Sequence, residues 1–577
     1  MFDTLIKGGT IVDGTGNKAF KGDIAIKGKI ISEVAPTINS KAGKTIHAEN
    51  KIVCPGFIDI HSHADLSIHY NNHDELLKPL VMQGITTFVG GNCGFSMAFA
   101  PEENRDLCIS YLEGLSCQSI KEQVDWHTPA EFMEKIEKRG SLLNMALLAG
   151  HGSLRIGAAG AANRLLSSDE QKKLERYLEE SMEMGCLGLS TGLQYFPGSQ
   201  SDTQELIKLG KVLKRYDGIF TSHLRSYSHT LNRAIDEVCE VGRENDIRIE
   251  ISHLYFQPYA KRFAAIVKGA VQLGSFIYNN LHIPIPIEKA LIPILKLIEK
   301  AHNEGVDVHF DMVPTSQGFT ELTAFLPPYA SEGGKIKMLE RLKDNSFRKK
   351  MLYDIENTEP EWPHRQGATW SFNYIKITGW NGLRVMTVTK EKNKWMEGKT
   401  FPEIGKALRK HPLDVICDLL IDENGYVMVF HTPTKPDDPF AARSMWEGFK
   451  HPLSMPVTDT ILMGIGRPSH VFYDCYPRFI STFVKERHLL SLEEAIKKAT
   501  SFPGMVMGIK KRGSIEKGNF ADLVIFDLDD LGTQANFYNP TVFPSGIDWV
   551  FINGKGVVSE GKFQKGILNG DVLKRAV

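Results

Sequence analysis

The sequence lacks the features that mark several protein classes. Its 68 Lys and Arg nearly cancel its 69 Asp and Glu, so it has neither a basic field for nucleic acid nor an acidic tail. Its eight cysteines follow no framework spacing and its first residues do not resemble a signal peptide, so we expect a reduced, cytoplasmic protein. No apolar run reaches the ~18 residues of a membrane span, because the most apolar stretch, residues 283–298, carries Glu288, Lys289 and Lys296. We expect a small-molecule partner, no nucleic acid and no membrane, and leave the oligomeric state open.

Both ends of the chain have the pattern of short strands. Residues 1–54 contain Thr4-Leu-Ile-Lys-Gly-Gly-Thr-Ile-Val and Asp23-Ile-Ala-Ile-Lys-Gly-Lys-Ile-Ile, separated by glycine and asparagine turns. A matching pattern returns in Asp522-Leu-Val-Ile-Phe-Asp and Trp549-Val-Phe-Ile-Asn-Gly. Each end buries too little to be stable alone. We therefore predict that residues 1–54 and 508–577 form one small β-sandwich, and that residues 55–507 form a second domain.

Eight apolar runs in the second domain alternate with helical patterns such as residues 167–184 and 284–304. The runs are residues 56–63, 85–93, 144–151, 186–192, 218–225, 247–253, 306–311 and 453–459. This alternation is typical of parallel β/α units, and eight of them close a barrel. We predict an α/β fold, a (β/α)8 TIM-like barrel beside the terminal sandwich. Such barrels place their active sites at the carboxyl ends of the strands.

The spacing of the runs departs from a minimal barrel. Roughly fifty residues separate the sixth and seventh runs, and about 315–450 separates the last two, beyond ordinary loop lengths. We expect the longer segment to be a lid or insert with its own structure. Arg248 and Glu250 also interrupt the sixth run, where a strand covered on both faces should be apolar.

Residue types that bind metals recur where the predicted strands end. His61 and His63 follow the first run, and residues two apart on a strand point to the same side. A single pair of this kind is often a hydrogen-bonded core pair. Further strand ends supply more such residues: Cys93 between glycines, His223, His253 and Asp459. Imidazole, thiolate and carboxylate are ligands for zinc, so the whole set favours a metal centre.

Longer segments resemble D-aminoacylases, the N-acyl-D-amino-acid deacylases of the metal-dependent amidohydrolase superfamily. The similar segments are Pro55-Gly-Phe-Ile-Asp-Ile-His-Ser-His, Gly91-Asn-Cys-Gly, Gly150-His-Gly-Ser-Leu-Arg, Gly188-Leu-Ser-Thr-Gly-Leu-Gln-Tyr, Ser222-His-Leu-Arg, Ile251-Ser-His, Leu326-Pro-Pro-Tyr-Ala-Ser-Glu-Gly-Gly and Gly513-Ser-Ile-Glu-Lys-Gly-Asn-Phe-Ala-Asp-Leu-Val. They span nearly the whole chain. The first is shared by the superfamily, whereas Asn-Cys-Gly and Leu-Ser-Thr-Gly-Leu are more specific to this branch.

The resemblance implies zinc-dependent hydrolysis of the amide bond of N-acyl-D-amino acids or related N-acyl compounds. It implies a tight zinc on Cys93, His223 and His253, and a second, weaker position that shares Cys93 and uses His61, His63 and Asp459. The metal would polarise the carbonyl and bring the pKa of its bound water near 7. Asp459 would take the proton of that water and return it to the leaving amine.

Three further residues are candidates for substrate binding. Tyr195 and Arg225, the latter on the same predicted strand face as His223, could orient the substrate's carboxylate or carbonyl, and His151 could line the mouth. Each could equally support the site from behind.

The chain departs from the family at positions associated with gripping the substrate's carboxylate. A lysine usually stands two positions after the strand-six histidine, where this chain has Tyr255. After strand seven the family tends to a tyrosine-rich segment, where this chain has Asp311-Met-Val-Pro-Thr. Lys261 and Arg262 could substitute. The acyl group, the side chain and the preference for D over L therefore stay open.

Two other interpretations remain. Cyclic-amide hydrolases such as dihydropyrimidinases and dihydroorotases share the barrel and the opening motif, but many superfamily members bridge two metals with a carboxylated lysine on strand four. Leu187-Gly-Leu-Ser-Thr-Gly-Leu-Gln-Tyr has no lysine, which leaves Cys93 as the bridge. The third interpretation is a barrel that has lost its chemistry and serves as a binding protein.

Overall fold

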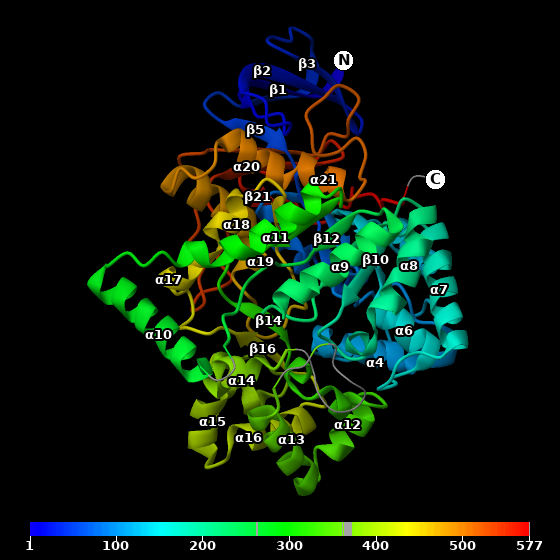
Figure 1. The fold of residues 1–577 in the computed structure, drawn as a ribbon. Helices are drawn as coiled ribbons and strands as arrows, with labels where there is room; N and C mark the ends of the chain where they lie inside the picture. The colour runs from blue at the N-terminus through cyan, green and yellow to red at the C-terminus, as the bar shows by residue number, and fades with distance from the viewer. Residues whose placement is uncertain (261–262, 360–361, 363–371, 576–577) are drawn as a thin grey trace.

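The computed structural model describes residues 1–260, 263–359, 362 and 372–575. Strands from the two ends of the chain share one nine-stranded sheet, in which β5 pairs with β18 and so joins the amino-terminal to the carboxyl-terminal strands (Figure 1). The strands of this sheet are β1 (Phe2–Ile11), β2 (Phe20–Lys27), β3 (Ile30–Ala35), β4 (Ala42–His47), β5 (Ile52–Pro55), β18 (Leu523–Phe526), β19 (Ile547–Ile552), β20 (Lys555–Ser559) and β21 (Lys562–Phe563).

All eight apolar runs between these strands contain a parallel strand. The strands are β6 (Phe57–Asp59), β7 (Ile85–Gly90), β8 (Asn144–Leu147), β9 (Ala149–Gly150), β10 (Gly188–Gly192), β11 (Ile219–His223), β12 (Ile249–Ile251), β13 (Val308–Met312) and β17 (Ser454–Pro456). They form a three-stranded sheet, β6-β7-β8, and a six-stranded sheet, β9-β10-β11-β12-β13-β17. Because neighbouring strands in each sheet pair in parallel, their carboxyl ends lie on one side of that sheet.

Two contacts link the ends of these sheets. Ser62, just after β6, forms a parallel bridge with Thr460, just after β17. The backbone N–H of Leu187, just before β10, donates to the carbonyl of Leu147 at the end of β8 at 2.8 Å. The residues that follow β6, β7 and β17 are thereby held beside those that follow β11 and β12.

Amphipathic helices cover the parallel strands. Ser167 begins α7 with a capping box to Glu170, and Leu174, Leu178 and Met182 bury one face of that helix. Figure 1 shows α7, α8 and α9 in succession along one side of the molecule. The principal outer helices are α5 (Pro129–Arg139), α6 (His151–Ala159), α7 (Ser168–Glu183), α8 (Thr203–Arg215), α9 (Leu231–Asn245), α11 (Ile292–Asn303), α19 (Val471–Ile480), α20 (Leu492–Ala499) and α21 (Ser501–Val506).

The long segment between β13 and β17 has secondary structure of its own. It contains an antiparallel sheet of three strands in the order β14-β16-β15, which lies with its helices at the bottom of Figure 1. Its elements are β14 (Gly318–Glu321), α12 (Lys335–Arg341), α13 (Asn345–Asn357), α14 (Tyr374–Thr378), β15 (Leu383–Thr387), α15 (Phe401–Leu408), α16 (Pro412–Asp422), β16 (Met428–His431), α17 (Pro439–Ala442), η9 (Arg443–Met445) and α18 (Trp446–Lys450). None of the described helices is both long and apolar enough to cross a membrane.

Candidate metal centre and cavity

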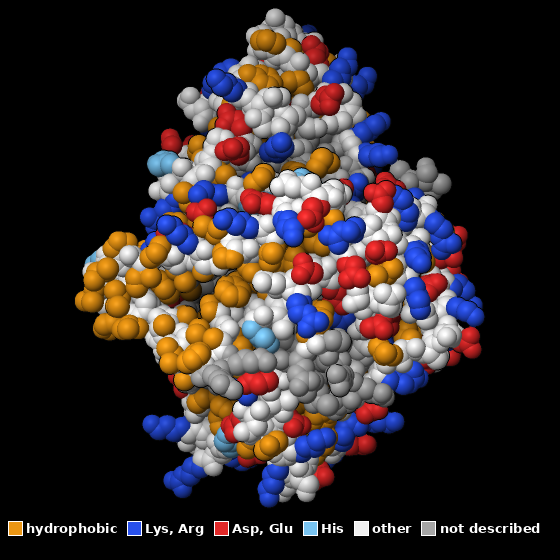
Figure 2. Space-filling model, in the orientation of Figure 1, with side chains coloured by type: hydrophobic (Ala, Val, Ile, Leu, Met, Phe, Trp, Pro, Cys, Tyr) orange, Lys and Arg blue, Asp and Glu red, His pale blue; other side chains and the backbone are white. Residues whose placement is uncertain are grey.

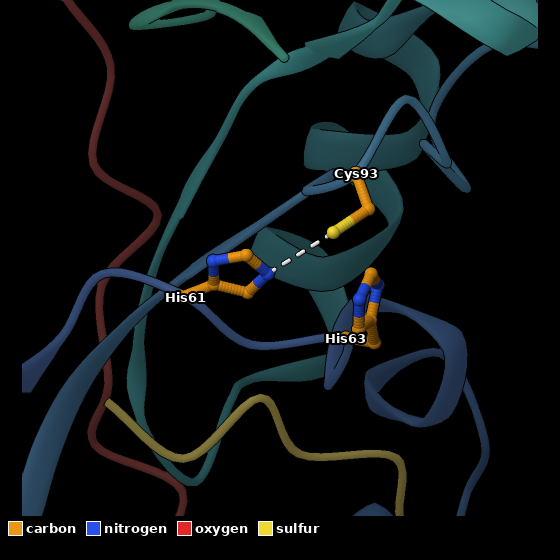
Figure 3. Close-up of side chains that lie close together, drawn as sticks. All are labelled: His61, His63 and Cys93. Carbon is orange, nitrogen blue, oxygen red and sulfur yellow. Dashed lines mark hydrogen bonds between the residues drawn. The ribbon is translucent and has the colours of Figure 1, made fainter. Parts of the chain in front are cut away.

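Side chains from four strand ends converge on the Cys93 sulfur. The Sγ atom lies 3.2 Å from Nε2 of His61, 3.7 Å from Nδ1 of His223 and 3.5 Å from Nε2 of His253. The ligand atoms of His61, His63 and Cys93 lie within 4.8 Å of one another (Figure 3). Those of Cys93, His223 and His253 also lie within 4.8 Å of one another. Cys93 is therefore common to both groups.

The backbone at the centre is held in an uncommon conformation. Cys93, His253 and Asp459 have φ values of 52°, 36° and 52°, in the left-handed region that non-glycine residues rarely adopt. A Cβ atom on Gly192 would lie 2.1 Å from the carbonyl oxygen of Cys93. Only glycine at position 192 lets strand β10 approach the Cys93 backbone so closely.

Two of the histidines are oriented by oxygen atoms on their far sides. Nδ1 of His61 lies 2.9 Å from Oδ2 of Asp311, and Nε2 of His223 lies 2.9 Å from Oε1 of Gln194. Each of these nitrogens donates to its oxygen, so the other ring nitrogen, which faces Cys93, keeps its lone pair. Nδ1 of His63 is buried and has no hydrogen-bond partner among the described residues. An arrangement with free lone pairs aimed at one point is suited to a metal cation.

The protonation states of the histidines and of Cys93 also suit metal binding. Burial and the nearby His61 lower the pKa of His253 to about 3, and burial with His253 lowers the pKa of His223 well below its usual range. Burial, together with the neighbouring Asp459, raises the pKa of the Cys93 thiol. The imidazoles are therefore neutral donors, and the thiol ionises when a cation offsets its burial. Two neutral imidazoles and one thiolate are a donor set that zinc prefers.

Asp459 lies beside this centre and faces the cavity. Its Oδ1 is 3.5 Å from Nε2 of His61 and 3.4 Å from Nε2 of His63, and its backbone N–H donates to the carbonyl of His61 at 2.9 Å. Burial opposes ionisation of this carboxyl, but the surrounding histidines outweigh burial, first through the hydrogen bond from His63, and lower its pKa. Asp459 is therefore a carboxylate at neutral pH and can accept a proton.

Two buried carboxyl groups beneath the centre are not identified by the sequence analysis as part of the site. Besides His61, Asp311 at the end of β13 accepts from the backbone N–H of His253. Glu250 accepts from the backbone N–H of Asp311 at 3.1 Å and from Oγ of Ser252 at 3.0 Å. Burial raises the pKa of both carboxyl groups, but Asp311 raises that of Glu250 further, whereas the hydrogen bond with Glu250 lowers that of Asp311. Of the two, Glu250 therefore holds the proton, and Asp311 accepts from His61. The polar interruption of the sixth run is the signal that indicates Glu250.

A cavity of about 150 Å³ opens from the centre toward the insert. Its described lining includes one carboxylate, Asp459, and no lysine or arginine. Tyr255, which stands where the family has lysine, stacks on Tyr227 with ring centroids 4.5 Å apart. The insert contributes Tyr374 and His431, which the sequence analysis does not identify, because only the fold brings the insert to the strand ends. The remaining walls are largely apolar, with Phe95, Leu115, Leu254, Phe256, Leu291, Met312, Val313, Phe319, Met445 and Ile461.

The three substrate-binding candidates have different surroundings. Tyr195 lines the cavity, with its ring 4.6 Å from that of His223 and its hydroxyl accepting from Thr320 at 3.0 Å. His151 and Arg225 are not among the residues that line it. The predicted substitutes Lys261 and Arg262 lie outside the described residues.

His151 and Arg225 each bind a buried glutamate. Nε2 of His151 lies 2.8 Å from Oε1 of Glu205. Nε of Arg225 lies 2.8 Å from Oε2 of Glu237, and its Nη1 donates to the carbonyl of Ser199 at 3.1 Å. Strand β11 ends at His223, so strand alternation does not extend to Arg225, whose guanidinium packs behind the strand end. These contacts favour the supporting role that the sequence analysis left open.

The chain is similar to known proteins over nearly its whole length. A model of the amidohydrolase family matches residues 381–557. The chain is 27% identical to N-acyl-D-glutamate deacylase and 24% identical to D-aminoacylase, both from Alcaligenes xylosoxydans xylosoxydans. The first match covers 96% of this chain and 93% of its relative, and the second covers 100% and 98%. Two solved structures at 23% identity cover 100% of both chains: a D-aminoacylase, with a TM-score of 0.73, and N-acyl-D-glutamate deacylase from Bordetella bronchiseptica with zinc and a phosphonate inhibitor, with 0.74.

Proposed function

We propose that this chain, which matches an amidohydrolase family model over residues 381–557 and is similar over nearly its whole length to N-acyl-D-amino-acid deacylases, is a zinc-dependent hydrolase of N-acyl-D-amino acids. It cleaves the amide bond to a carboxylic acid and a free amine. The observation that carries the proposal is the convergence of neutral imidazoles on the Cys93 sulfur at the floor of a cavity.

We also propose a domain organisation for the chain. The parallel strands close into a (β/α)8 barrel of residues 55–507, with the insert at about 315–450, and residues 1–54 and 508–577 form a β-sandwich. The bridge between Ser62 and Thr460 and the hydrogen bond between Leu187 and Leu147 support closure, because they join the two parallel sheets at both edges. A cytoplasmic location stays a prediction.

Cys93, His223 and His253 would hold a tight zinc, and His61, His63 and Asp459 would add a weaker position that shares Cys93. When bound, zinc polarises the carbonyl of the substrate and lowers the pKa of water. Asp459 accepts the proton of the attacking water, and its ionised state follows from the histidines around it. The same carboxyl then returns that proton to the leaving nitrogen, which departs as a neutral amine.

The walls of the cavity exclude water and orient the acyl group. Tyr195 stands beside His223, where its ring limits the space open to the scissile bond. Because the described lining has no lysine or arginine, neutral hydrogen-bond donors such as Gln257, Thr315 and Ser316 would bind the substrate's carboxylate. His151 and Arg225 keep the ends of β9 and β11 in place through Glu205 and Glu237.

A hydrolysis panel on zinc-loaded protein tests the proposal. N-acetyl-D-amino acids should be hydrolysed, and prolonged treatment with a chelator should remove the activity until zinc is returned. Ring opening of a hydantoin or dihydrouracil, with linear N-acyl-amino acids inert, would instead show a cyclic-amide hydrolase. Strand β10, Gly188-Leu-Ser-Thr-Gly192, has no lysine to bridge two metals, which disfavours that outcome.

A further inference from the structure

The chain exposes an apolar projection, which we call the apolar arm: Phe263, helix α10 (Ala264–Leu281) and residues 282–286. Figure 1 shows α10 standing out from the body, and Figure 2 shows hydrophobic side chains gathered on this projection. The structure describes sixteen exposed large hydrophobic residues, and six of them lie on the arm, among them Ile266 at 67% and Leu273 at 58% exposed. The others on the arm are Phe263, Phe276, Leu281 and Ile283. Soluble monomers rarely gather so many.

The polar side of α10 faces the body of the protein. Ser275 donates from Oγ to Oδ2 of Asp438 at 2.7 Å, and Asn279 donates from Nδ2 to Oδ1 of the same residue, also at 2.7 Å. Asp438, the first residue before α17, is fully buried. Gly274 is buried, and a Cβ there would lie 2.9 Å from the ring of Phe440.

The opposite side of α10 carries Ile266, Leu273 and Phe276 outward. At 100° per residue these three fall within one stripe, and Ser275 and Asn279 fall on the other side. A helix that lies on a water-soluble protein normally turns its apolar stripe inward. The hydrogen bonds to the buried Asp438 instead hold α10 with its polar side inward and its apolar stripe outward.

We infer that the apolar arm docks on the surface of a lipid bilayer. Between Phe263 and Ile287 the sequence has no Asp or Glu and one lysine, Lys268, so nothing on the arm repels an anionic lipid surface. An amphipathic helix that does not span lies in the plane of the interface with its apolar stripe in the acyl region. This inference replaces the expectation that no membrane is involved, which rested on the lack of a spanning run.

A head-to-tail contact with a second copy of the chain fits the arm less well than lipid. The arm is convex, so a head-to-tail contact needs an apolar hollow or patch elsewhere on the surface. The other exposed large hydrophobic residues that the structure describes lie on different elements, for example Ile336 on α12, Tyr353 on α13 and Met505 on α21. A bilayer needs no complementary patch.

The arm leads directly to the wall of the cavity. It continues into η4 (Ile287–Leu291), whose Ala290 and Leu291 line the cavity, and η4 packs on η9, which contributes Ser444 and Met445. Docking would therefore place one apolar wall of the cavity at the lipid surface. On the proposed function, the enzyme would then take N-acyl substrates whose long acyl chain is dissolved in the bilayer.

Vesicle co-sedimentation tests docking without relying on activity. The full-length protein is mixed with vesicles of phosphatidylcholine and phosphatidylglycerol. It is compared with an arm variant, Leu273→Ser with Phe276→Ser, and with a control, Ile336→Ser with Tyr353→Ser, which removes more exposed large hydrophobic side chains from other elements. The wild type and the control should bind, and the arm variant should lose roughly tenfold or more in partition coefficient. Circular dichroism checks that all three are folded.

Failure of the wild type to bind vesicles, or equal binding of the arm variant, would overturn the inference. Sedimentation velocity that shows a wild-type dimer converted to monomer by the arm variant, without vesicle binding, would assign the arm to a second copy and overturn it too. In activity assays the arm variant should slow hydrolysis of a vesicle-dissolved long-chain N-acyl-amino acid and leave that of its N-acetyl counterpart unchanged. Absence of hydrolysis in all three proteins would refute the proposed function, but the result on vesicle binding would still hold.

Discussion

Replacing Asp311 by Asn should weaken zinc binding, chiefly at the second position that uses His61, without unfolding the protein. The Asp311 carboxyl is almost fully buried, lies 2.9 Å from Nδ1 of His61 and accepts from the backbone of His253, so it orients two candidate ligands at once. Asn keeps the size of the side chain but removes the charge that makes imidazole a better donor. Loss of such a partner typically lowers metal affinity 10- to 100-fold, or about 1.4–2.8 kcal/mol.

The assay is a competition titration of zinc with a chromogenic chelator, for the wild type and Asp311→Asn. Asp307→Asn is the matched control, because Asp307 is half exposed and pairs with Arg248 and His309, away from Cys93. The control should keep wild-type zinc affinity, and circular dichroism should show folded protein throughout. Unchanged zinc affinity in folded Asp311→Asn would refute the reasoning about the centre.

Two further changes test supporting contacts. Arg225→Ala should lower the free energy of unfolding by about 3–5 kcal/mol in denaturant titrations, because it leaves the buried Glu237 without its charged partner. A raised KM with unchanged stability would instead assign Arg225 to substrate binding. Burial disfavours the His470 imidazolium, but the hydrogen bonds with Asp437 and Asp474 outweigh burial and raise the pKa of His470 above 6.5. The stabilisation that the imidazolium provides is therefore full below pH 6.5 and is lost as pH rises through the raised pKa. His470→Gln should therefore destabilise the protein more at pH 5.5 than at pH 9, and an equal loss at both would contradict this account.

The parallel strands could be predicted because their signal is local. Each of the eight runs is a short apolar segment followed by a polar or glycine-rich turn, and each contains a strand in the structure. The sheet of β14, β15 and β16 could not be predicted, since β14 pairs with β16 across more than a hundred residues. The orientation of α10 was equally beyond prediction, because apolar side chains are expected to be buried and here Asp438 holds them outward.

The convergence of the candidate ligands followed from one rule, that carboxyl ends of parallel strands meet. That rule works for Cys93, His223 and His253, which lie at or just after strand ends. It does not apply to Arg225, which lies beyond the end of β11, or to Gln194 and His431, which a loop and the insert bring to the site. Positions that depend on how a loop folds back leave no periodic signal in the sequence.

The most direct test of the account is the zinc content of Cys93→Ala, measured by plasma mass spectrometry beside the wild type and His61→Ala. The Cys93 sulfur is the ligand atom common to both groups of candidate ligands. The account predicts that Cys93→Ala holds almost no zinc and hydrolyses no N-acyl-D-amino acid, whereas His61→Ala keeps most of its zinc. Folded Cys93→Ala that retains the zinc and the activity of the wild type would contradict it.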